Sequence, residues 1–147
     1  MDLTLYNIQK TLSQTAQSLA TQPQVEIPLK ETWDKETKTY TREIFVPKGS
    51  MIIGFKHRTA CVNIVTKGHF LIREGLQGEP KEIKVPNNET YTFITPKDTQ
   101  KVGYAIEDTI FINVFTDVPT DTYENLIEAL IYPIEGINLI TKGPKCQ

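Results

Sequence analysis

The hydrophobic residues of this chain change their spacing twice, which divides the chain into three parts. Over the first 20 residues they recur every three or four positions, the spacing of an amphipathic helix. From Val25 onward they alternate with polar residues in short runs separated by turn residues, which is typical of strands. Near the end of the chain the helical spacing returns. The pattern predicts an N-terminal helix over 1–22, a β-barrel over 25–116 and a C-terminal helix with a tail over 121–147, all within a single domain.

The middle part reads as a series of short strands. Two runs, Val25–Trp33 and Tyr40–Val46, flank the turn residues 34–37 and predict a hairpin. Short strands at regular spacing predict a mainly β protein, built as a sandwich or barrel. The further runs lie at 51–56, 61–66, 70–73, 83–85, 91–94, 102–106 and 109–115.

The two end segments carry predictions of their own. The N-terminal helix has a polar face without the lysines and arginines of a membrane-surface helix, so we expect it to pack on this domain or on a second subunit. In the C-terminal helix, Asp121 with Glu124 three residues later predicts an N-terminal cap, and Pro133 predicts the end of the helix. The tail after Ile134 reads as an extra strand or an arm that reaches a neighbour.

Composition narrows the function classes without choosing one. The chain has 147 residues, which fits one domain. Its 16 Lys and Arg against 18 Asp and Glu give a net charge of -2, so we expect no nucleic acid as a partner. No apolar run approaches the length of a membrane span, and no signal peptide precedes the first helix, so we expect no membrane partner and no secretion. Two cysteines, Cys61 and Cys146, make no disulfide framework.

Residues 49–68 resemble the first sequence motif of the cupin superfamily. In that family the motif runs Gly, five residues, His-x-His, three or four residues, Glu, six residues and Gly. This chain keeps the spacing between the two glycines. Phe55 and His57 stand at the two histidine positions, and Cys61 stands at the glutamate position. Only His57 therefore occupies a metal-ligand position.

The second cupin motif is matched in its turn and not in its ligands. Pro96 begins the Pro-x-Gly turn, with Asp98 in place of the glycine. Lys101 falls on the histidine position and Ala105 on the asparagine position. The resemblance covers about residues 38–116 and implies a cupin-like jelly-roll barrel.

The chain also resembles small single-domain cupin-like proteins of tailed bacteriophages. Those proteins share a lone histidine after the first turn, a Lys-x-Gly-Tyr-Ala-like segment and a closing helix. Residues 101–105 and 123–131 fit this outline. The resemblance implies a location in the cytoplasm of an infected host or in a virion.

The sequence offers too few ligands for the metal site of a metal-dependent cupin. Metal-dependent cupins use three His and one Glu, whereas this chain has two histidines in all, His57 and His69. We therefore expect no metal cofactor. One alternative is a zinc site made by His57, Cys61 and a carboxylate such as Glu43 or Asp98. Another is suggested by thiol dioxygenases of the superfamily, which carry a cysteine at the position of Cys61; the simpler interpretation is a small buried residue.

The cupin frame gathers one set of candidate ligand-binding residues at the barrel mouth. Histidine, lysine and arginine donate hydrogen bonds, and tyrosine can donate or stack, which suits an anionic or nucleotide-like ligand. No residue is assigned a catalytic role. The candidate residues are His57, Arg58, Cys61, Lys101 and Tyr104.

Three functions stay open. The first is a non-catalytic phage accessory or structural protein that forms a homo-oligomer and contacts phage or host proteins, with Val25–Val46 as the predicted dimer edge. The second is binding of a small anionic or nucleotide-like molecule in the barrel mouth, for example to sequester a host signal. The third is an enzyme, either a metal-independent epimerase-like cupin or a degenerate metal-dependent one.

Overall fold

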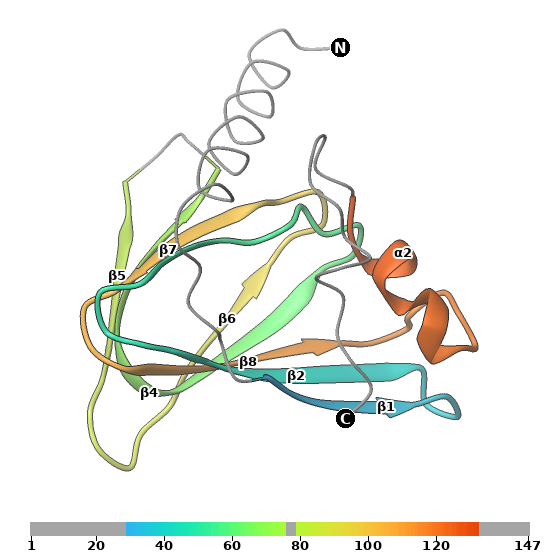
Figure 1. Ribbon diagram of the computed structural model, residues 1–147, viewed down its shortest axis with the longest axis horizontal. Helices are drawn as coiled ribbons and strands as arrows, with labels where there is room; N and C mark the ends of the chain where they lie inside the picture. Colours follow the sequence, from blue (N-terminus) through green and yellow to red (C-terminus); the bar gives the residue numbers. More distant parts are fainter. Residues whose placement is uncertain (1–28, 76–78, 133–147) are drawn as a thin grey trace, which may run out of the picture.

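The computed structural model describes residues 29–75 and 79–132 of the chain, which form one curled antiparallel sheet and a short helical segment (Figure 1). The prediction of a mainly β protein is confirmed. The predicted N-terminal helix and the tail after Ile134 lie outside the described residues. The strands are β1 (Leu29–Asp34), β2 (Thr39–Val46), β3 (Met51–Ile53), β4 (Cys61–Glu74), β5 (Lys81–Val85), β6 (Tyr91–Thr95), β7 (Lys101–Ala105) and β8 (Thr109–Phe115).

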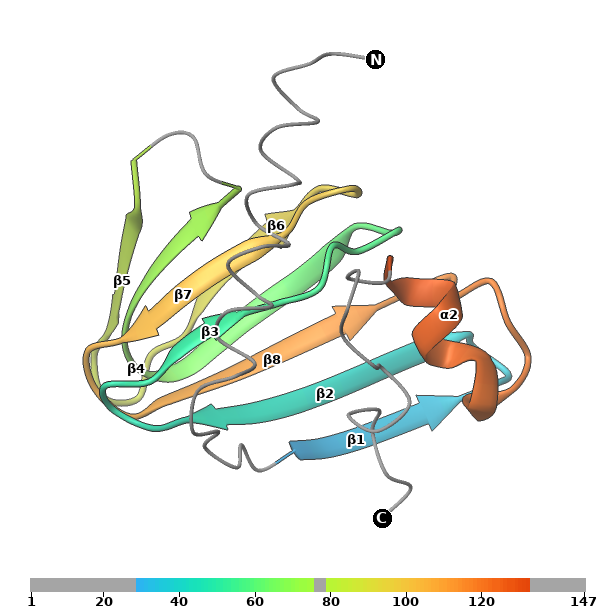
Figure 2. The same cartoon turned by 45° about the horizontal axis from the view of Figure 1, so that its top comes forward.

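The longest strand, β4, organises the sheet. The strand order is β1-β2-β8-β4-β7-β3, and β5 and β6 also pair with β4. The first half of β4 pairs with β6 and β8, whereas its second half pairs with β5 and β7. Because β4 passes from one set of partners to the other, the sheet curls around an interior, as Figure 2 shows.

The prediction of two separate strands at 61–66 and 70–73 was wrong, because Gly68 bends the chain without ending the strand. Its φ of 122° lies in the left-handed region that glycine adopts freely. A Cβ at this position would lie 2.3 Å from the Thr109 side-chain oxygen, so the close approach of β8 also requires glycine. β4 consequently runs for 14 residues through the bend.

The predicted hairpin is confirmed where the structure describes it. β1 pairs with β2 in antiparallel register, with Trp33 opposite Tyr40 and Asp34 opposite Thr39. β2 continues the sheet by pairing with β8 along its other side. The hairpin therefore forms one end of the strand order, with β1 outermost.

The interior contains two apolar clusters. The cluster that we call the upper cluster joins the helical segment to the sheet. The cluster that we call the lower cluster fills the strongly curled part of the sheet, at the other end of the interior. In the lower cluster Phe70 lies so close to β7 that a Cβ on Gly103 would come within 2.2 Å of its ring. The upper cluster consists of Tyr40, Cys61, Phe115, Val118, Leu126, Leu130 and Ile131, and the lower of Val46, Val65, Phe70, Ile72, Ile83, Ala105 and Phe111.

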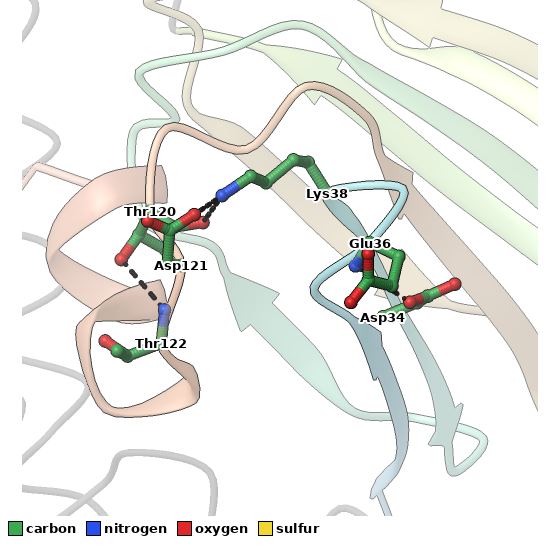
Figure 3. Close-up of polar contacts among 6 residues, drawn as sticks. All are labelled: Asp34, Glu36, Lys38, Thr120, Asp121 and Thr122. Atoms are coloured by element: carbon green, nitrogen blue, oxygen red, sulfur yellow. Dashed lines mark hydrogen bonds and ion pairs between the residues drawn. The ribbon is translucent and has the colours of Figure 1, made fainter.

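The C-terminal helix is shorter than predicted and is not capped by Asp121. A 3-10 turn, η1 (Tyr123–Asn125), precedes α2 (Leu126–Leu130). The residue before η1 is Thr122, which makes no side-chain cap hydrogen bond. Asp121 forms an ion pair with Lys38 instead, and Lys38 Nζ also donates to the Thr120 carbonyl oxygen (3.1 Å; Figure 3). No helix among the described residues is long and apolar enough to cross a membrane.

Candidate functional site

A row of polar side chains crosses the interior face of the sheet between the two apolar clusters. Successive residues of a strand point to opposite faces, so every second residue of β2, β8 and β4 faces inward. The register places Arg42 opposite Asn113 and Asn113 opposite Asn63. These three residues and Lys101, which reaches them from β7, are called the polar row below.

Hydrogen bonds join the polar row into one chain. Lys101 Nζ donates to Asn63 Oδ1 (2.7 Å), and Asn113 Nδ2 donates to the same oxygen (2.9 Å). Arg42 Nε donates to Asn113 Oδ1 (2.9 Å). Two side-chain amides therefore connect a lysine ammonium to an arginine guanidinium.

The amide orientation of Asn63 is fixed by its other contacts. Its Nδ2 donates to Thr95 Oγ1 (2.8 Å) and to the carbonyl oxygens of Cys61 and Phe93 (3.3 Å each). All three are placed as acceptors, so Asn63 Oδ1 must be the atom that faces Lys101. The asparagines are 0 % and 2 % exposed, and a buried amide with this many partners holds its position firmly.

The two cations of the row have no carboxylate at ion-pair distance among the described residues. The ion pairs found there join other side chains, at Lys30–Glu43, Lys38–Asp121, Lys48–Glu107 and His69–Glu82. Lys101 Nζ lies 5.4 Å from the Phe111 ring centre, and the Arg42 guanidinium lies 5.9 Å from that of Phe115. Aromatic faces attract cations, but they do not neutralise the charge.

Burial lowers the pKa of Lys101 to about 8. The positive charge of Arg42 lowers it as well, whereas Cys61 and Glu74 oppose the shift. Near neutral pH the ammonium is therefore only moderately favoured over the free amine. A lysine of this kind responds strongly to any negative charge that arrives beside it.

His57 is a second titratable group next to the row, and it is neutral. It is 1 % exposed, and its ring packs edge-on against Phe115 with 5.1 Å between centroids. Burial lowers its pKa to about 3, with further contributions from the positive charges of Arg42 and Lys101. Its Nδ1 atom is buried without a hydrogen-bond partner among the described residues. An unpartnered ring nitrogen beside two cations is a group that a bound molecule can satisfy.

Cys61 faces the interior beside the row as a protonated thiol. It is buried, and burial raises its pKa, although Lys101 and Arg42 act in the opposite direction. Its Sγ lies 3.7 Å from Asn63 Oδ1. The low polarity of the thiol suits a packing residue of the upper cluster better than an anionic ligand group.

Of the five candidate residues from the sequence, three come together and two do not. His57, Cys61 and Lys101 gather at the polar row: Cys61 and Lys101 both contact Asn63 Oδ1, and the pKa of His57 is lowered by burial and by the positive charges of Arg42 and Lys101. Arg58 lies on the outside, where its Nε donates to the carbonyl oxygens of Glu128 and Ile131 at the end of α2.

Tyr104, the other outlying candidate, is on the outer face of β7. It is 40 % exposed and lies opposite Met51 of β3, which is also exposed. Alternation explains the position, because the inward-facing neighbours of Tyr104 are Gly103 and Ala105. Arg58 and Tyr104 therefore do not reach the polar row.

The carboxylates that were considered for a zinc site do not join His57 and Cys61. Glu43 is paired with Lys30 (3.6 Å), and Asp98 accepts a hydrogen bond from the Tyr132 hydroxyl (2.8 Å). Within 29–75 and 79–132, no group of three or more His, Cys, Asp or Glu side chains could hold a metal ion. The donor set of the row, with amides and cations, does not fit a metal.

Sequence reasoning missed Arg42, Asn63 and Asn113. A signal for the asparagines was present, because each stands between apolar residues that occupy the same face two positions away. In Cys61-Val62-Asn63-Ile64-Val65 and in Phe111-Ile112-Asn113-Val114-Phe115 the asparagine interrupts an inward-facing apolar series. A polar residue at such a position is buried and hydrogen-bonded, which marks it for attention.

The fold is similar to that of cupin proteins. No family model and no curated protein matches the chain. Among solved structures, a cupin superfamily protein from Desulfitobacterium hafniense aligns with a TM-score of 0.50 at 6% identity, covering 68% of this chain and 85% of that one. An RmlC-like cupin family protein from Methanocaldococcus jannaschii also gives 0.50, at 15% identity over 65% of this chain and 84% of that one.

An enzyme is among the similar structures as well. Salicylate 1,2-dioxygenase from Pseudoaminobacter salicylatoxidans aligns with a TM-score of 0.55 at 12% identity, over 93% of this chain and 37% of that one. At such low identity the likeness shows the fold alone. The predicted cupin-like jelly-roll architecture is confirmed, as a curled antiparallel half-barrel that is followed, in the described part of the chain, by a short C-terminal helix.

Proposed function

We propose that the interior of the half-barrel binds a small anionic molecule at the polar row. The observation that carries this proposal is the pairing of Lys101 with Arg42 through two buried amides, with no carboxylate at ion-pair distance in the described part of the chain. The molecule would supply the negative charge that the row lacks.

The energetics of burial support a binding role for these cations. Removing a charge from water is costly unless an opposite charge or several hydrogen bonds compensate for it. Each cation of the row has one hydrogen bond to an asparagine, and they repel each other, as the lowered pKa of Lys101 reflects. An anion between them relieves both costs at once, so this arrangement serves binding better than it serves stability.

The donor set indicates which anion fits. A guanidinium binds a carboxylate or a phosphate with two parallel hydrogen bonds, and a lysine adds a point charge. Phe111 and Phe115 border the row with apolar surface, through their rings near the two cations. The ligand class is a small carboxylate or phosphate whose remaining atoms are partly apolar.

Isothermal titration calorimetry tests the proposal directly, with inorganic phosphate and malonate as probes. We expect at least one of them to bind the full chain, and we expect Lys101→Met and Arg42→Met each to weaken binding by about tenfold or more, the value of one charged hydrogen bond. Lys97→Met is the matched control, because Lys97 is exposed in the turn between β6 and β7. Equal affinity in all four proteins, or no binding by the wild type, would contradict the proposal.

Self-association is a second candidate function, supported by the outer face of the sheet. Ile94 is 66 % exposed, and the register places it beside Val62, which in turn lies beside Val114. An apolar row across β6, β4 and β8 is the kind of surface that a second copy of the chain covers. Sedimentation at increasing concentration should show a dimer that Ile94→Glu abolishes. A monomer at every concentration would contradict this candidate.

The predicted phage setting has no bearing on either test. The similar solved structures give information on the fold and none on the biological setting. Contacts with phage or host proteins stay a prediction.

A further inference from the structure

We propose that Lys101 forms an imine with the carbonyl carbon of an oxo acid whose carboxylate is bound by Arg42, an inference that rests on the anion site proposed above. The substrate class is then the oxo acids, and their capture is covalent and reversible.

The polar row has an amine at one end and a guanidinium at the other. Lys101 Nζ lies 2.7 Å from Asn63 Oδ1, Arg42 Nε lies 2.9 Å from Asn113 Oδ1, and the two amides bond to each other. An oxo acid carries the two groups that these ends receive. Its carboxylate matches the guanidinium, and its carbonyl carbon is the ordinary target of a lysine amine.

The surroundings of Lys101 favour the neutral amine that this reaction needs. Desolvation and an adjacent cation are the two means by which proteins activate a lysine nucleophile, and Lys101 has both, in its burial and in Arg42. Before an anion arrives, its pKa of about 8 leaves on the order of a hundredfold more free amine at neutral pH than the ordinary value of 10.5 would. The Phe111 ring beside Nζ adds an apolar wall.

The step balances without any further reactant. The Nζ lone pair adds to the carbonyl carbon, a C–N bond forms, and the π electrons of the carbonyl move to its oxygen. Both protons of the neutral amine end on that oxygen, which departs as water, and a C=N double bond remains. Nothing is oxidised or reduced, so no cofactor is required.

The other reactive groups near the row do not compete with Lys101. Cys61 has a raised pKa because it is buried, so it remains a thiol, a far weaker nucleophile than a thiolate. His57 stays neutral and adds no third positive charge that would disfavour the ammonium still further. Glu74 opposes the lowering of the pKa of Lys101, which helps to retain some of the protonated form that attracts an anion.

Reductive trapping tests the proposal on the full chain. The protein is incubated with pyruvate, or with levulinate, whose carbonyl lies further from its carboxylate, together with sodium cyanoborohydride, which reduces an imine to a stable secondary amine. Intact-mass measurement and peptide mapping then locate the adduct. We expect a single adduct at Lys101, formed at least about tenfold faster than at any exposed lysine. Comparison of the two acids reports the spacing that the row accepts.

Two variants separate this proposal from the binding site on which it rests. Lys101→Arg keeps the positive charge and lacks the nucleophilic amine, so we expect it to bind malonate or phosphate and to yield no adduct at position 101. Lys97→Met should be trapped like the wild type. Adducts spread over exposed lysines, with anion binding intact, would overturn the imine and leave the anion site standing. A wild type that binds neither phosphate nor malonate removes both proposals.

Discussion

The polar row and the lower apolar cluster are neighbours in the interior, yet one consists of amides and cations and the other of apolar side chains. The lower cluster fills its part of the barrel with aliphatic and aromatic side chains such as Phe70 and Val65, and the Phe70 ring packs directly against Gly103. The two amides of the polar row are buried as well, whereas its two cations, Lys101 and Arg42, are half-buried. The two regions therefore place groups of opposite polarity in the same interior.

The difference indicates which region serves the fold and which serves a ligand. Transfer of apolar side chains out of water is favourable, so the lower cluster stabilises the native state. Two like charges held together away from water are unfavourable, so the polar row is retained at a cost to stability. Binding sites commonly combine a stable scaffold with polar or charged groups that lower the stability of the native state.

Truncation of the lower cluster should produce the largest loss of stability. Phe70→Ala removes a buried ring and leaves a cavity against Gly103, so the free energy of unfolding should fall by about 3–5 kcal/mol. Urea denaturation followed by circular dichroism measures the loss. Phe70→Leu, which keeps more of the volume, should lose less than half as much; equal losses would show that packing at this position is not the cause.

Removal of the amide that joins the row should come next. Asn63→Ala leaves Lys101 and Asn113 without their shared acceptor, so the free energy of unfolding should fall by about 2–3 kcal/mol. Asn87→Ala in the exposed turn after β5 is the matched control, with an expected change near zero. If both variants were equally stable in urea, the network would carry no energetic weight.

Acid should reveal the buried neutral histidine. His57 has a pKa of about 3 in the native state, below its ordinary value of 6.5, so below pH 6.5 the unfolded chain binds a proton that the native protein does not. The free energy of unfolding should therefore decrease as the pH is lowered, by about 2 kcal/mol from pH 6.5 to pH 5. His57→Gln should remove this part of the pH dependence.

The second histidine provides the control for the acid experiment. His69 bonds the Glu82 carboxylate at the sheet surface, so His69→Gln should keep the decline that His57 causes between pH 6.5 and 5. Equal slopes in the wild type and in His57→Gln would contradict the neutral buried imidazole.

The smallest effect is expected at the ion pair beside η1. Asp121→Asn breaks the pair with Lys38, both of which contact solvent, so it should cost under about 1 kcal/mol, and the loss should shrink as salt is added. Asn caps a helix as well as Asp does, so a helix cap at Asp121 would instead show as no loss in Asp121→Asn and a salt-independent loss of about 1–2 kcal/mol in Asp121→Ala.

Local patterns in the sequence predicted the strands well, because alternation and turn residues act over a few positions. The same alternation could not show that β4 continues through Gly68, since a glycine reads as a break until its left-handed conformation is known. The cap at Asp121 failed for a related reason, because the Lys38 side chain that captures it comes from a distant turn.

The residues of the candidate site could be predicted only where a known motif gave their positions in the fold. The cupin-like spacing placed His57, Cys61 and Lys101 in one interior, and the structure brings these three together. Arg42 could not be found in this way, because its partner Asn113 is 71 positions away and the contact depends on the pairing of β2 with β8. Long-range register of this kind is not visible in a single sequence.

Equilibrium unfolding of the wild type and of Lys101→Met, each with and without phosphate or malonate, tests most directly the claim that the polar row is kept for an anion. Without an anion we expect the variant to be as stable as the wild type or more stable by up to about 2 kcal/mol. The reason is that it lacks the desolvated positive charge of Lys101 near Arg42. With the anion we expect the wild type to gain stability and the variant to gain little. A variant that is less stable than the wild type, and that gains as much from the anion, would contradict the account.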